Sequence, residues 1–165
     1  MDKQNIEAEV AEKLTERNET VATAESATGG LVGSMLTNVP GASEYYDSSL
    51  VVYSDRSKQQ LLAVSSEALE NGAVSKEVAK EMEQGVRDTS QTDWGVSTTG
   101  YAGPTGGNSE PIGTVYIGVA FSGNSSRDPF AVAEKHQFEG SREERKQEFA
   151  RQALKALLKQ ISSNA

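Results

Sequence analysis

A serine stands where an expected strand ends and a glycine-rich turn begins. Ser26 lies in T-A-E-S-A-T-G-G at 23–30, just before an apolar helical pattern. A turn of this kind exposes a side chain and directs helix N–H groups toward it. Ser26 could attack a carbonyl carbon while those N–H groups stabilise the oxyanion. A helix-capping serine is the alternative, and the spacing alone favours it.

Neighbouring Glu25 should point to the opposite face of the strand, so we expect it to be structural or an acceptor behind the site. A nucleophilic serine also needs a base. His136, the single histidine, is expected in mid-strand with no route to Ser26. A lysine can replace it if burial or a nearby cation keeps the amine neutral. Lys58 follows a short apolar run ending at Tyr53, although an exposed helix lysine is the commoner case. The Tyr53 hydroxyl could orient the pair, or its ring could fill core.

A second candidate site is the glycine-rich segment 100–113, G-Y-A-G-P-T-G-G-N-S-E-P-I-G. Loops of this composition can approach a ligand closely and bind phosphate with their N–H groups. The segment matches neither a P-loop nor a dinucleotide fingerprint, and a flexible hairpin is the alternative. Arg142 begins a predicted helix, where a cation opposes the helix dipole and is tolerable if it faces an anion shared with the helix N–H groups; it could equally pair with Glu139 or Glu143.

Helices and strands alternate along most of the chain. Apolar spacing predicts a helix through Ile6, Val10 and Leu14, another from Leu31 to the stop at Pro40-Gly41, a third capped by Ser54 or Asp55, a fourth from Ser75 through Val86, and a last one from Ser141 to Ile161. Strands are expected at 20–25, at 50–53 as a buried strand, and at 94–98, 112–121 and 129–138. The helix after Ser54 should bury Leu61 and Leu62. The alternation predicts one α/β domain over 1–165, a three-layer α/β/α sandwich, and the late run of strands indicates a mixed sheet.

Composition limits the class of protein. The 165 residues carry a net charge of −8, with no cysteine and one histidine. Disulfides, thiolate chemistry and a histidine-rich metal site are therefore excluded. No basic patch offsets the acidic charge, so direct DNA binding is not expected. There is no apolar run of membrane-spanning length and no secretory signal, so we expect a cytoplasmic protein.

Taken together, these stretches resemble the CinA C-terminal domain family. The matching segments are 23–30, V-V-Y-S-D-R-S-K at 51–58, G-A-V-S at 72–75, G-Y-A-G-P-T-G-G at 100–107, P-I-G-T-V at 111–115 and F-E-G-S-R at 138–142. They occur in order over nearly the whole chain. The sequence departs from the family at Ala27, often cysteine; at Tyr101, usually small and aliphatic; and at Ser141, often aspartate. The resemblance implies the stand-alone form, without the molybdopterin-binding-type domain of longer relatives.

The resemblance also implies an activity, the hydrolysis of the amide of nicotinamide mononucleotide to nicotinic acid mononucleotide and ammonia in pyridine nucleotide salvage. It places the catalytic groups on Ser26, Lys58 and Tyr53. Substrate binding is expected from Thr28, Gly29, Gly30, Gly100, Gly103, Thr105, Gly106, Gly107 and Arg142. It implies no metal or organic cofactor, a nucleotide as the small-molecule partner, and a homo-oligomer. The alternatives are a non-catalytic nucleotide- or protein-binding paralogue, which Tyr101 leaves open, and a competence or DNA-repair accessory.

Overall fold

A computed structural model describes residues 5–107 and 110–163 of the chain. The elements follow one another as α1 (Ile6–Arg17), β1 (Val21–Glu25), α2 (Leu31–Leu36), a 3-10 helix (Ala42–Glu44), β2 (Tyr46–Val51), α3 (Asp55–Leu62), α4 (Ser66–Glu70), α5 (Lys76–Ser90), β3 (Trp94–Gly100), β4 (Thr114–Phe121), β5 (Phe130–Gln137) and α6 (Arg142–Ser162). Side chains of Asn5, Ser54, Ser65, Ser75 and Ser141 cap helices, and Ser141 with Glu144 forms the predicted capping box.

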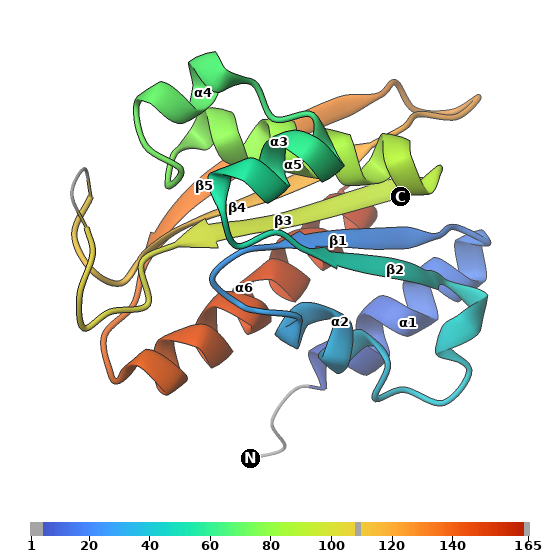
Figure 1. Cartoon of the computed structure of the whole chain (residues 1–165). Coiled ribbons are helices and arrows are strands. Elements are labelled where there is room, and N and C mark those ends of the chain that lie inside the picture. The colour runs from blue at the N-terminus through green and yellow to red at the C-terminus, as the bar shows by residue number, and fades with distance from the viewer. Residues whose placement is uncertain (1–4, 108–109, 164–165) are drawn as a thin grey trace.

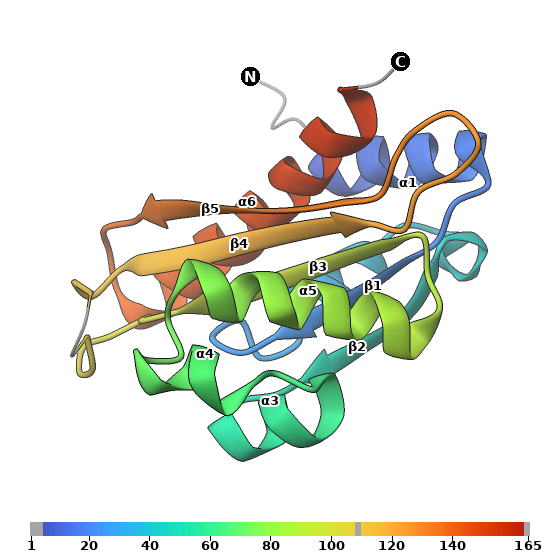
Figure 2. The same cartoon turned by 90° about the horizontal axis from the view of Figure 1, so that it is seen from above.

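One five-stranded sheet forms the middle layer, in the order β2-β1-β3-β4-β5. β1 runs parallel to β2 and to β3, whereas β4 and β5 are antiparallel to their neighbours. Helices α1, α2 and α6 cover one face, and α3, α4 and α5 cover the other (Figures 1 and 2). The predicted three-layer α/β/α sandwich with a mixed sheet is confirmed.

Each face of the sheet has its own apolar core. The larger one joins the sheet to α1, α2 and α6 and includes Trp94, Phe121 and Phe149. The smaller one lies beneath α3 and α5, where Leu62 and Met82 pack on Ala22 and Ala24 of β1. Because β1 is buried on both faces, its position is fixed from two sides, and so is the turn that follows it.

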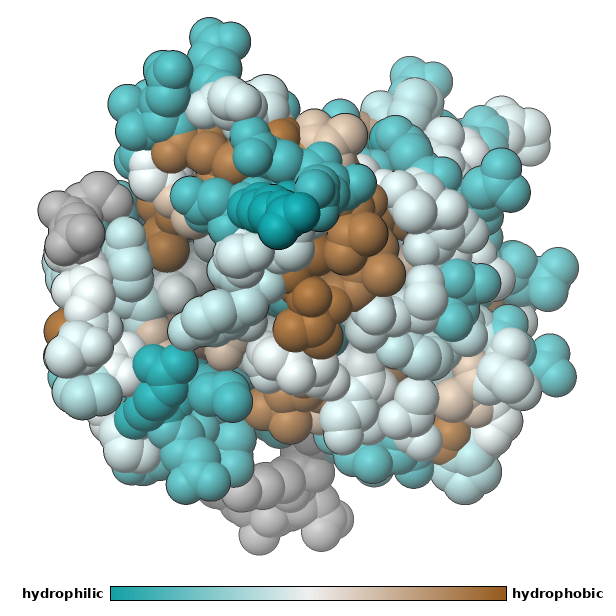
Figure 3. Space-filling model, viewed as in Figure 1, coloured by the Kyte–Doolittle hydropathy of each residue, from teal (hydrophilic) through white to brown (hydrophobic). Residues whose placement is uncertain are grey.

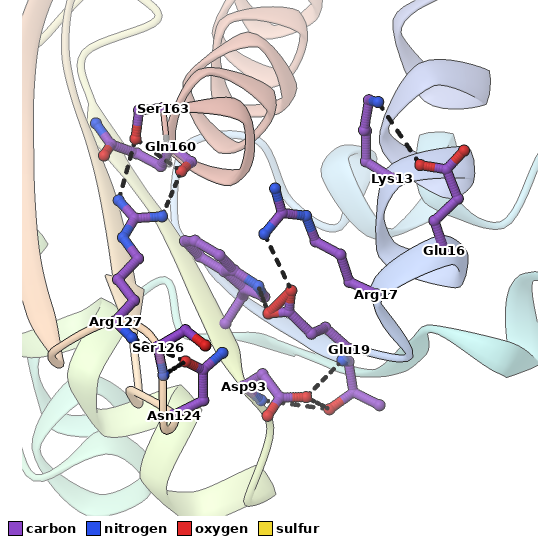
Figure 4. Close-up of polar contacts among 12 residues, drawn as sticks. Lys13, Glu16, Arg17, Glu19, Asp93, Asn124, Ser126, Arg127, Gln160 and Ser163 are labelled. Atoms are coloured by element: carbon purple, nitrogen blue, oxygen red, sulfur yellow. Dashed lines mark hydrogen bonds and ion pairs between the residues drawn. The ribbon is translucent and has the colours of Figure 1, made fainter. Parts of the chain in front are cut away.

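The amino end of β1 is held by polar contacts. Trp94 Nε1 donates to Glu19 at 3.0 Å, and the Thr20 backbone N–H donates to Asp93 at 2.8 Å. Figure 4 shows this region together with Arg127, whose guanidinium lies 4.4 Å from the Phe130 ring centroid and donates to the carbonyl of Gln160. These contacts lie at the end of the sheet opposite the β1–α2 turn.

Two expectations about the second strand were wrong. The strand is β2, Tyr46–Val51, rather than 50–53, and it is an edge strand with a single neighbour, β1. Val51 is therefore 48% exposed instead of buried.

Leu61 on α3 is also 51% exposed, because α3 turns Leu62 and Lys58 inward instead. Apolar surface gathers over β2 and α3 on the face shown in Figure 3.

Candidate active site

Ser26 and Lys58 lie together at the carboxyl end of β1. Ser26 follows the last residue of that strand, and its backbone N–H donates to the Thr98 carbonyl of β3 at 3.1 Å. The amine of Lys58 lies 3.2 Å from Ser26 Oγ and donates to the Tyr53 carbonyl at 2.9 Å. Ser26 is 8% exposed and Lys58 1% exposed. The structure thus brings the predicted nucleophile and base into hydrogen-bond contact.

The surroundings of Lys58 favour its neutral form. The side chain points from the first turns of α3 back under the helix, toward β1. Burial lowers the pKa of the Lys58 amine, and the nearby Asp55 carboxylate opposes that effect. A neutral amine that donates to the Tyr53 carbonyl keeps a lone pair for the Ser26 hydroxyl proton. This arrangement is the one required of a lysine base.

Tyr53 contributes through its backbone as well as its side chain. Its carbonyl holds Lys58, while its ring is 66% exposed and does not fill core. Its hydroxyl accepts from the Arg142 guanidinium at 3.3 Å. The predicted orienting contact between the Tyr53 hydroxyl and the Ser26–Lys58 pair is therefore not formed directly, because the ring turns outward toward α6.

Glu25 is the structural acceptor that the strand alternation predicted. Its carboxylate is fully buried and accepts from the backbone N–H groups of Gly30, Val32 and Gly33 at 2.9–3.1 Å. The hydroxyls of Thr23 and Thr28 also donate to it, at 2.9 and 2.6 Å. The N–H groups that begin α2 are thus occupied, and the expectation that they would face an oxyanion at Ser26 is wrong. No described residue accepts from the backbone N–H of Ala27 or of Thr28, which lie nearer to the serine.

The glycine loop between β3 and β4 lies close to the start of α6 (Figure 1). Arg142 donates to the Gly103 carbonyl at 2.7 Å, and Arg145 donates to the Ala102 carbonyl at 3.3 Å. Gly100 is needed for packing, since a β-carbon there would lie 2.7 Å from the Thr114 carbonyl oxygen. The described part of the loop ends at Gly107. Within it, Thr105 is exposed, and Gly106 and Gly107 have positive φ. Two arginines of α6 therefore hold the loop by donating hydrogen bonds to its backbone carbonyl groups.

The turn after Ser26 forms the floor of a cavity. A space of about 390 Å³ lies between residues 28–31 and the first turns of α6. Gly29 and Gly30 have φ of 61° and 104°, a conformation that L side chains rarely adopt, so glycine shapes this floor. The Thr28 hydroxyl is not free to bind a ligand, because it lies between Glu25 and Thr98.

His136 is remote from the serine, as expected. It lies on β5, which β3 and β4 separate from β1, and its Nε2 is 3.4 Å from a Glu134 oxygen. The residues described by the structure contain no cluster of three or more metal-ligating side chains. Among the same residues, no helix combines the length and apolar character that crossing a bilayer requires.

Comparison with known proteins decides the family. The family description "CinA C-terminal domain" matches residues 3–161. The chain belongs to the CinA C-terminal domain family. A CinA-like protein of Salinibacter ruber is 45% identical over 159 residues, covering 95% of this chain and 37% of that protein. One of Desulforapulum autotrophicum is 46% identical, covering 94% and 36%. The chain thus spans less than two-fifths of these curated relatives.

Solved structures of the CinA superfamily have the same fold. A competence-damaged protein (CinA) superfamily protein from Klebsiella pneumoniae superposes with a TM-score of 0.88 at 31% identity, covering 96% of both chains. The competence/damage inducible protein CihA from Agrobacterium tumefaciens gives 0.86 at 30% identity, also covering 96% of both chains. Membership in the CinA family and the architecture therefore agree.

One residue that lines the cavity was not singled out from the sequence. Lys146, one turn after Arg142 on α6, lines the cavity above Gly29. Spacing gave a signal, because residues four apart share a helix face and Arg142 was already a candidate. Lys146 lies among the alternating charges of 142–151, a pattern that is typical of a solvated helix face.

Proposed function

We propose that this CinA-family chain hydrolyses the carboxamide of nicotinamide mononucleotide, giving nicotinic acid mononucleotide and ammonia. The observation that carries the proposal is the buried contact of 3.2 Å between Lys58 Nζ and Ser26 Oγ. A serine beside a buried lysine of lowered pKa is the arrangement of serine–lysine amide hydrolases. The nucleotide substrate comes from the family resemblance, not from the geometry.

Acylation starts with neutral Lys58, which takes the proton of the Ser26 hydroxyl. Oγ then bonds to the carboxamide carbon, and the carbonyl oxygen becomes an oxyanion. We assign the oxyanion to the backbone N–H groups of Ala27 and Thr28, which have no described acceptor. The C–N bond breaks as protonated Lys58 gives its proton to the leaving nitrogen, which departs as ammonia.

Deacylation uses the same groups, with water in place of Ser26 as the nucleophile. Lys58, neutral again, takes a proton from a water molecule, and the resulting hydroxide attacks the ester carbon on Ser26. The ester bond breaks, the proton returns to Oγ, and nicotinic acid mononucleotide leaves. Each turnover consumes one water and releases one ammonia, and Lys58 acts once as base and once as acid in each half.

The test is product analysis with the purified chain. Incubation with nicotinamide mononucleotide should release ammonia and nicotinic acid mononucleotide in equal amounts. Formation of free nicotinamide instead would indicate cleavage of the glycosidic bond and would contradict amide hydrolysis. The absence of any product would remove the proposed activity.

A further inference from the structure

The cavity over the turn that follows Ser26 has a lining that the proposed reaction does not use. It occupies about 390 Å³ between the β1–α2 turn and α6, and it begins at the residues that follow the serine. Its floor is the backbone of Gly29 and Gly30, without side chains. A second space, lined by Leu31 and Met35 on one side and by Gln147 and Arg151 on the other, continues it along the groove between α2 and α6. Together they offer room for a group larger than the carboxamide.

The three cations at the start of α6 are used differently. Arg142 donates to Gly103 and Tyr53, and Arg145 donates to Ala102 and Phe138. Both guanidinium groups are therefore bound to the protein. Lys146 has neither a hydrogen bond nor an ion pair to any residue that the structure describes. Lys146 is half-buried, and its Nζ lies above Gly29, 3.9 Å from the place that a β-carbon on that glycine would occupy.

The floor of the cavity cannot supply the charge that an anion needs. The Gly30 N–H donates to the Glu25 carboxylate, and the Gly29 N–H donates to the Ser26 carbonyl. The α2 terminus is thus already neutralised by Glu25. Glu143 on the cavity rim is exposed, so solvent screens its charge. Among the described residues that line this cavity, Lys146 is the positively charged one, so it is the group that can bind an anion there.

We infer that Lys146 binds the phosphate of the mononucleotide substrate, in the cavity over Gly29 and Gly30. This inference rests on the proposed function, and it moves the phosphate away from the glycine loop and Arg142, where the sequence placed it. Glycine at 29 and 30 leaves room for the phosphate above the turn, and the ammonium of Lys146 supplies the charge-assisted hydrogen bond. Arg142 then acts as a positioning residue that fastens the loop to Tyr53.

Binding to a Ser26→Ala chain tests this without turnover. Calorimetry compares nicotinamide mononucleotide with nicotinamide riboside, which lacks the phosphate. Adding Lys146→Gln should weaken mononucleotide binding about 10- to 100-fold, the range expected for one hydrogen bond to a charged group, and leave riboside binding unchanged. Lys146→Arg should restore most of the affinity. Lys155→Gln, an exposed lysine further along α6, is the matched control and should change neither.

Several results would overturn the inference. These are an equal loss for both ligands, no loss for either, or no measurable binding of the mononucleotide. The reaction is judged separately by ammonia release from the wild-type chain. A chain that binds the mononucleotide through Lys146 and releases no ammonia leaves the phosphate site standing and removes the reaction. If the chain releases ammonia and Lys146→Gln leaves the ratio of kcat/KM for the mononucleotide and the riboside unchanged, the reaction stands and the phosphate site is removed.

Discussion

Lys58 Nζ lies 3.2 Å from Ser26 Oγ, across 32 positions of sequence and at the junction of two elements. Ser26 is fixed by β1, which is buried on both faces, and Lys58 by the first turns of α3. The Tyr53 carbonyl accepts a hydrogen bond from the same amine. The proposed base and the proposed nucleophile are thus held together in a buried position by the fold itself.

Substituting Lys58 should remove the base whether or not the charge is kept. Guanidinium cannot accept a proton near neutral pH, so Lys58→Arg should lower kcat/KM about as much as Lys58→Ala, by roughly 10²- to 10⁴-fold. Because burial lowers the pKa of Lys58, the wild-type kcat/KM should rise with pH through a value below that of a free lysine. The measurement is kcat/KM against pH for all three proteins. An active Lys58→Arg enzyme would show that positive charge, not proton transfer, is required there.

Glu25→Gln should destabilise the turn that carries Ser26. The carboxylate accepts from three backbone N–H groups and two hydroxyls, whereas an amide would direct an N–H at one of these donors. We expect the free energy of unfolding to fall by roughly 2–3 kcal/mol. Urea unfolding measures it, with Glu12→Gln on the exposed face of α1 as the control. Equal unfolding midpoints for Glu25→Gln and wild type would contradict the assigned role.

Glu83 makes stability depend on pH. It is fully buried, neither carboxyl oxygen has a hydrogen-bond partner among the described residues, and it fills the space over Gly118. Burial raises the pKa of Glu83 from 4.5 to about 9, against the opposing charges of Lys80 and Arg87. The folded chain therefore holds this proton more tightly than the unfolded chain. Its contribution to stability is fully present below about pH 4.5 and is lost as pH rises toward about 9.

The isosteric Glu83→Gln removes this titration. The stability of Glu83→Gln relative to wild type should therefore increase with pH, by at most about 1.4 kcal/mol per pH unit. Chemical unfolding at about pH 5.5 and about pH 8.5 gives the two differences to compare. An identical difference at both values would mean that Glu83 does not titrate in this window.

The sequence predicted the architecture because apolar periodicity and turn residues leave local signals, whereas the pairing of Ser26 with Lys58 came from the family resemblance. Apolar periodicity marks α5 and α6, and the serine before two glycines marks the end of β1. The position of β2 was predicted wrongly, since Leu50, Val51 and Val52 form an apolar run that an edge strand buries only in part. The outward turn of Tyr53 and the inward turn of Lys58 depend on how α3 packs, which spacing does not specify. Cytoplasmic location and oligomer formation stay predictions.

Ammonia release from nicotinamide mononucleotide, measured side by side for wild type and Ser26→Ala, tests whether Ser26 is the nucleophile. Ser26 is a nucleophile in this account, so the wild-type chain should release ammonia with continued turnover. Ser26→Ala should release none above the uncatalysed rate while keeping the wild-type circular dichroism and unfolding midpoint. Ammonia release by Ser26→Ala near the wild-type rate would make Ser26 a structural residue and would contradict the mechanism.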